Sequence, residues 1–172
     1  MEITIQGIEN ETTVVQKAFK EALESLAYAW LESIAECESP IEKALYPALA
    51  CELTDYQAFN PELSMQYEIK NHNGKIVRRA DFMIIVNGNS SDEMRFIVEC
   101  DSHQYHDTNP KQIKKDRLVD AKLLSQGYRT IRVNGVDIHK DVLAVAEHIC
   151  STMLDCLLEQ SLRKNGDWDY GK

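Results

Sequence analysis

The chain has 172 residues, 44% of them hydrophobic and 27% charged, and a formal net charge of −9 at pH 7. These values fit one globular domain, 1–172, and disfavour a protein that coats nucleic acid nonspecifically. They also exclude membrane spans, since no apolar run approaches the roughly 20 residues that a span needs. The acidic start MEITIQGIENE lacks the basic segment of a signal peptide, so we expect a cytoplasmic protein with reduced cysteines.

The charge is distributed unevenly along the chain. Residues 1–69 carry 3 Lys+Arg and 13 Asp+Glu, residues 70–132 carry 12 and 8, and residues 133–172 carry 4 and 7. A basic middle inside an acidic protein can face a polyanion locally. From charge alone, it is equally open that this asymmetry has no functional role.

Two amphipathic helices are predicted first. Over residues 11–36, apolar side chains recur every three or four positions, at Val15, Phe19, Ala22, Leu26 and Trp30. Such a stripe is usually core, and the alternative is a seam for a homodimer or another protein partner.

The second helix has a clear start. Ser39 suits the N-cap, Pro40 the first helical position, and Glu42 completes a capping box. Pro47 should bend or shorten this helix.

Beyond residue 60 the pattern changes to period two. We predict strands at 64–70, 75–86 and 94–101, with a turn at 71–74 and a loop at 87–93. A helix from Asn109–Pro110 to Gly127, a strand at 128–133, a helix at 137–159 and a frayed tail at 160–172 follow. This order predicts an α/β fold with a mixed four-stranded sheet flanked by helices.

Acidic and imidazole side chains follow the third strand directly, in FIVECDSHQYHD (96–107). Alternation places Glu99 and Asp101 on one face and Cys100 on the other. A hairpin centred near residue 90 would bring Asp81 of the preceding strand opposite residues 99–101.

Carboxylates crowded beside a hydrophobic sheet favour a hard divalent cation, Mg²⁺ or Mn²⁺. The cation would activate water and stabilise charge developing on a phosphate. His103 and His106, just past the strand, are placed to move protons.

The segments RRADF, FIVECDSHQYHD and DRLVDAKLLSQGYRTIRV resemble the PD-(D/E)XK nuclease superfamily, closest to its very-short-patch-repair endonuclease branch. The resemblance covers about residues 39–149 and implies a restriction-endonuclease-like fold that hydrolyses nucleic-acid phosphodiesters, with DNA as the expected partner. The matching positions are Glu42, Asp81, Glu99, Asp101, His103, Asp116, Arg117, Asp120, Leu123, Gly127, Tyr128 and Arg132.

By this resemblance, Asp81 and Glu99 would hold the metal, and Glu42 would complete the acidic shell. Asp101 stands where many members carry a lysine, so His103 or His106 would take over proton transfer or phosphate polarisation. Basic side chains near the acids are candidates for contacting nucleic acid: Arg78, Arg79, Lys114 and Arg117.

Several alternatives remain open from the sequence. The capping box explains Glu42 as fully as a catalytic role does. A zinc site of Cys100, His103 and His106 lacks an evident fourth ligand.

A second acidic pattern, Glu68-Ile69-Lys70 with Asp55 upstream, is disfavoured because its strand runs into a hairpin turn. The whole chain could also be a nuclease-fold module that binds nucleic acid or protein without catalysis.

Overall fold

The computed structural model of this protein describes residues 13–101 and 110–165. In chain order its elements are α1 (Thr13–Glu36), α2 (Pro40–Glu52), the 3-10 helix η1 (Leu53–Phe59), β1 (Glu62–Lys70), β2 (Ile76–Val86), β3 (Met94–Asp101), α3 (Pro110–Ser125), β4 (Tyr128–Asn134), α4 (Gly135–Lys140) and α5 (Val142–Asn165). None of these helices combines the length and apolar character needed to cross a bilayer.

The four strands form one mixed sheet, as the sequence predicts, and their order in it is β1-β2-β3-β4. Pairing is antiparallel between β1 and β2 and between β2 and β3, and parallel between β3 and β4 across the α3 crossover. Phe82 pairs with Val98, so the β2–β3 hairpin is centred at residue 90 as expected. The strand that carries Glu99 is therefore interior.

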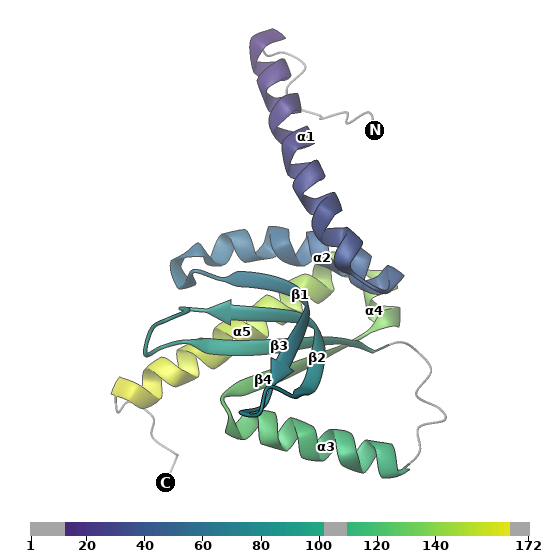
Figure 1. Cartoon of the computed structure of the whole chain (residues 1–172). Helices are drawn as coiled ribbons and strands as arrows, with labels where there is room; N and C mark the ends of the chain where they lie inside the picture. The colour runs from purple at the N-terminus through teal and green to yellow at the C-terminus, as the bar shows by residue number, and fades with distance from the viewer. Residues whose placement is uncertain (1–12, 102–109, 166–172) are drawn as a thin grey trace.

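Helices cover both faces of the sheet (Figure 1). Phe82, Ile84, Phe96 and Val98 pack against α2 and α5 in the larger core, whereas Met83 and Ile97 pack against Leu123 of α3 in the smaller one. The helix α3 ends at Ser125, just before Gly127, whose φ of 88° a residue with a Cβ would adopt only under strain. The β2–β3 hairpin is therefore held between α2 and α5 on one face of the sheet and α3 on the other.

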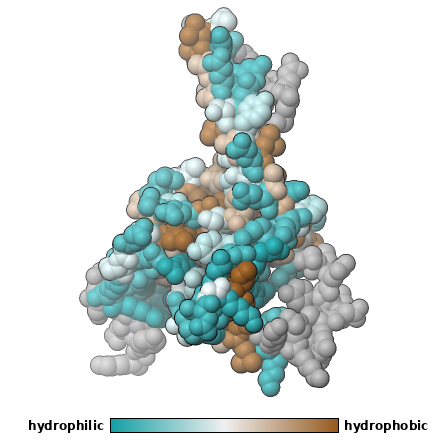
Figure 2. All heavy atoms as spheres, viewed as in Figure 1, coloured by the Kyte–Doolittle hydropathy of each residue, from teal (hydrophilic) through white to brown (hydrophobic). Residues whose placement is uncertain are grey.

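The N-terminal helix differs from the simplest sequence interpretation. Figure 1 shows α1 projecting from the rest of the molecule, and Figure 2 shows apolar side chains on its open surface. Leu26 is 51% exposed, and Val15 is also exposed. The interpretation of this stripe as core is therefore wrong for α1, because only the C-terminal end of the helix reaches the body of the domain.

The C-terminal helix also departs from the prediction of one helix over 137–159. The helix is interrupted at Asp141, whose extended backbone (φ −158°, ψ 90°) ends α4. The Asp141 side chain then accepts a hydrogen bond from the Ala144 N–H at the start of α5. In addition, α5 continues to Asn165, so residues 160–165 are helical rather than frayed.

Candidate active site at the fork between β2 and β3

The two central strands separate beside Asp81. Their pairing begins at Phe82 and Val98, while β2 stays paired with β1 and β3 with β4 beyond this point. The Asp81 Oδ2 accepts a hydrogen bond of 2.7 Å from the Cys100 N–H. The carboxylate thus satisfies an amide that would otherwise bond to the neighbouring strand, and it lies in the fork between β2 and β3.

Side-chain alternation along β2 changes at the same residue. Ala80 belongs to the core under α3 and Phe82 to the core under α2 and α5, although residues two apart in a regular strand share a face. Opposite this point on β1, Gln66 has a φ of 47°. The predicted centre of the hairpin is confirmed, but Asp81 lies just outside the β2–β3 pairing, which begins at Phe82, and simple alternation fails there.

Asp81 lies within electrostatic range of acids from both sides of the sheet. Burial raises the pKa of Asp81 from 3.8 to about 6, against the lowering effect of the Cys100 N–H. Glu99, Glu42 and Asp101 raise this pKa further. Four of the acids that the sequence singles out therefore interact electrostatically, with Asp81 in the fork acted on by the other three.

Glu99 and Asp101 enter an ion network on the α3 side of the sheet. The network alternates acid and base across three strands and a helix, in the order Glu99, Arg78, Asp120, Arg132 and Asp101. The successive N–O distances are 2.8, 3.2, 2.9 and 3.5 Å. The shared network places Glu99 and Asp101 on one face, as alternation along β3 predicts.

Glu42 is a buried acid that caps α2. One carboxylate oxygen accepts from the Glu38 N–H at 3.0 Å and from Gln66 Nε2 at 2.7 Å, while the other accepts from the Ser39 hydroxyl. The Ser39 side chain in turn accepts from the Glu42 N–H, which completes the predicted capping box. Glu42 thus has a full structural role while it also adds negative charge near Asp81.

The donor chemistry at the fork fits a hard divalent cation, since carboxylates are crowded beside a hydrophobic sheet. Their spacing in this structure is not that of a formed site. Across residues 13–101 and 110–165, no three histidine, cysteine or acidic side chains lie close enough to hold a metal ion. Glu99 Oε1 is paired with Arg78 instead, so a metal that binds this oxygen at the fork would compete with the arginine.

The predicted histidines, His103 and His106, lie outside the described residues. The predicted basic residues are placed differently from one another. Arg78 is committed to the ion network, and Arg79 forms an exposed pair with Glu38. On α3, Lys114 and Arg117 are exposed, where solvent or a polyanion can reach them.

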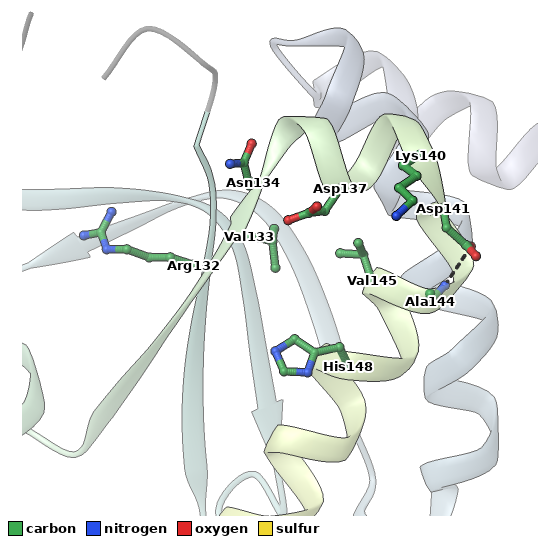
Figure 3. A pocket seen from close by; sticks show the side chains of 9 residues that line it. All are labelled: Arg132, Val133, Asn134, Asp137, Lys140, Asp141, Ala144, Val145 and His148. Atoms are coloured by element: carbon green, nitrogen blue, oxygen red, sulfur yellow. Dashed lines mark hydrogen bonds between the residues drawn. The ribbon is translucent and has the colours of Figure 1, made fainter. Parts of the chain in front are cut away.

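A pocket of about 590 Å³ borders the ion network on the other side of β4 (Figure 3). It lies between β4, α4 and α5, and Figure 3 shows Asp137 and His148 near Val133, with Lys140 farther along α4. Arg132 lines both this pocket and a second one of about 450 Å³ beside α3. Sequence reasoning did not identify the pocket, because its side chains come from elements with no distinguishing pattern.

The alternative sites receive less support. Cys100 packs against the core opposite Glu99, away from the ion network, and burial raises the pKa of its thiol. Glu68 and Lys70 form an exposed ion pair on the edge strand β1. The preferred site, by contrast, requires β3 to be an interior strand, and β3 lies between β2 and β4.

Comparisons of the chain with protein-family models, with curated proteins and with solved structures give no match.

Proposed function

We propose that this protein is a divalent-metal-dependent endonuclease of the PD-(D/E)XK type on a restriction-endonuclease-like core, with DNA as its substrate. The observation that carries the proposal is the position of the Asp81 carboxylate in the fork, where it accepts from the Cys100 N–H at 2.7 Å and lies within electrostatic range of Glu99, Glu42 and Asp101. Carboxylates gathered this way are stabilised by a bound cation, and burial increases the need for one.

In this proposal, Asp81 and Glu99 hold Mg²⁺ or Mn²⁺. When bound, this cation would supply an activated water and charge neutralisation at the phosphate. The chain provides the rest: Arg132, held by Asp120, pairs with Asp101 on β3, and α3 carries the exposed Lys114 and Arg117. His103 or His106 remains the proposed proton carrier.

Isosteric substitutions provide the test. Plasmid DNA is incubated with Mg²⁺ and wild type, Asp81→Asn or Glu99→Gln, and nicking is followed on agarose gels. We expect each variant to lose roughly 100-fold or more of the rate, the loss typical when a group that stabilises transition-state charge is removed. Lys70→Ala serves as the matched control and should nick as wild type does, because its ion pair lies at the exposed sheet edge.

Equal nicking by wild type and both acid variants would contradict the proposal. Loss of nicking in Lys70→Ala with activity kept in Glu99→Gln would transfer the site to the Glu68-Ile69-Lys70 pattern on β1.

A second candidate function is a non-catalytic module that binds a protein partner. The exposure of apolar residues on the projecting helix α1 favours it, since Val14 and Tyr28 are 77% and 71% exposed. A calorimetric titration with MnCl₂ distinguishes the endonuclease from the non-catalytic module. Absence of binding at millimolar metal, with the acids intact, would favour the module.

A further inference from the structure

The guanidinium of Arg78 is bonded to Glu99, one of the two acids that would hold the proposed metal. Arg78 Nε donates to Glu99 Oε1 at 2.8 Å, and its Nη1 donates to Asp120 Oδ1 at 3.2 Å. Both members of the first pair are largely buried, with side chains 15% and 13% exposed. A cation that binds Glu99 through Oε1 therefore competes with a desolvated, hydrogen-bonded arginine for the same oxygen.

Arg78 is held from two directions through different nitrogens. The Asp120 contact does not depend on Glu99, and Asp120 is itself fixed by Arg132 at 2.9 Å. When Glu99 turns to a metal, Asp120 keeps the guanidinium at the border of the site. The Nε–H that Glu99 releases then lacks a partner, and a guanidinium offers its donors in a planar fork that suits phosphate oxygens.

We propose that Arg78 is the resident counterion of Glu99, that it competes with the divalent metal for this carboxylate, and that it becomes a phosphate ligand once displaced. The inference rests on the proposed nuclease function and assigns Arg78 a substrate-binding role within that site. It explains how buried acids remain charge-balanced before metal and substrate arrive. It also predicts that metal affinity and cleavage respond in opposite directions when Arg78 is removed.

The first measurement is metal affinity without nucleic acid. Calorimetric titrations with MnCl₂ compare wild type, Arg78→Ala and Arg79→Ala. Because the competing cation is gone, we expect Arg78→Ala to bind Mn²⁺ about tenfold more tightly than wild type. Arg79→Ala removes the same charge from the neighbouring residue, whose partner Glu38 is exposed, and should leave the affinity within about twofold.

The second measurement is plasmid nicking at saturating Mn²⁺. We expect Arg78→Ala to be at least tenfold slower despite its tighter metal binding, because the displaced guanidinium no longer contacts the phosphate. Should Arg78→Ala fail to fold, Arg78→Lys replaces it. Lysine keeps the charge without the planar fork, so we expect intermediate metal affinity and slower nicking.

The outcomes distinguish the two proposals. Unchanged or weaker Mn²⁺ binding by Arg78→Ala overturns the competition, and full nicking at saturating metal overturns the phosphate role, while wild-type activity leaves the nuclease proposal standing. If neither wild type nor the variants bind Mn²⁺ at millimolar concentration, the metal site itself is wrong, and the inference is overturned with it.

Discussion

At the carboxyl of Asp81, burial and hydrogen bonding act in opposite directions. Burial and three nearby acids favour the protonated form, while the Cys100 N–H favours the ionised form, and burial dominates. The folded protein therefore binds this proton more tightly than the unfolded chain does. By linkage, Asp81 lowers the free energy of unfolding as pH rises from about 4 to about 6. Above that range, Asp81 causes no further decrease.

Replacement of Asp81 by asparagine should remove this pH dependence. Its amide oxygen still accepts from the Cys100 N–H, but the side chain does not titrate. We expect Asp81→Asn to be more stable than wild type at pH 7–8, by on the order of 1–2 kcal/mol after solvent screening, and to gain little at pH 4. Urea unfolding at pH 4, 5, 6, 7 and 8 measures the difference. A difference that stays constant across this range would contradict the raised pKa.

Sequence reasoning predicted the acids of the candidate site but not their partners. The spacing of Glu99 and Asp101 and the centre of the hairpin follow from alternation and loop position, which are local properties. The bonds of Arg78 to Glu99 and Asp120 span 21 and 42 residues and depend on how α3 lies over the sheet. The change of face at Asp81 has no sequence signal either, because β2 keeps an ordinary strand composition there.

Among the elements, α2 is the one whose start the sequence specifies most completely. The Ser39 side chain accepts from the Glu42 N–H, and Pro40 occupies the first turn where its missing N–H has no cost. The Glu42 carboxylate in turn accepts from the Ser39 hydroxyl and from the Glu38 N–H. Such reciprocal capping explains why this boundary could be predicted without knowledge of the fold.

Removal of the cap should weaken the domain without altering the chemistry. We expect Ser39→Ala to lower the free energy of unfolding by about 1 kcal/mol, measured by urea titration at 25 °C, with plasmid nicking unchanged. Ser33→Ala is the matched control, since the Ser33 hydroxyl bonds only within exposed α1, and its effect should stay within about 0.5 kcal/mol. Equal losses in both variants would argue against the cap.

The break between α4 and α5 illustrates what the sequence conceals. The apolar spacing of Ile138, Val145, Ile149 and Met153 is satisfied in the structure, where all four side chains are buried. Residue 141 is neither glycine nor proline, so no composition signal marks the break. Its aspartate caps the following helix, a role that is visible only once the helix is known to begin there.

At the scale of the molecule, α1 differs from the body of the domain in how much of its surface is buried. The body has two cores around a sheet, whereas α1 leaves most of its surface open. Periodicity reveals that a helix has an apolar face, but it does not reveal what covers that face. For this reason the existence of α1 was predictable and its exposure was not.

Deletion of residues 1–30 should therefore leave the body intact. We expect the free energy of unfolding to change by less than about 1 kcal/mol, because the exposed residues of α1 add little packing, and Mg²⁺-dependent nicking to persist. Urea unfolding and the plasmid assay measure both. Leu45→Ala, at a fully buried position of α2, calibrates the assay and should cost roughly 2–5 kcal/mol. A truncated chain as unstable as that variant would show that α1 supports the domain.

The bond between Asp81 and the Cys100 amide has a consequence for evolution as well. An aspartate that completes the backbone pairing of two central strands is useful to the fold whether or not the protein cuts anything. Selection for stability alone would retain an acceptor at this position in a lineage that had lost catalysis. Aspartate rather than asparagine at position 81 would then be the informative choice, because only a need for negative charge offsets the cost of burying it.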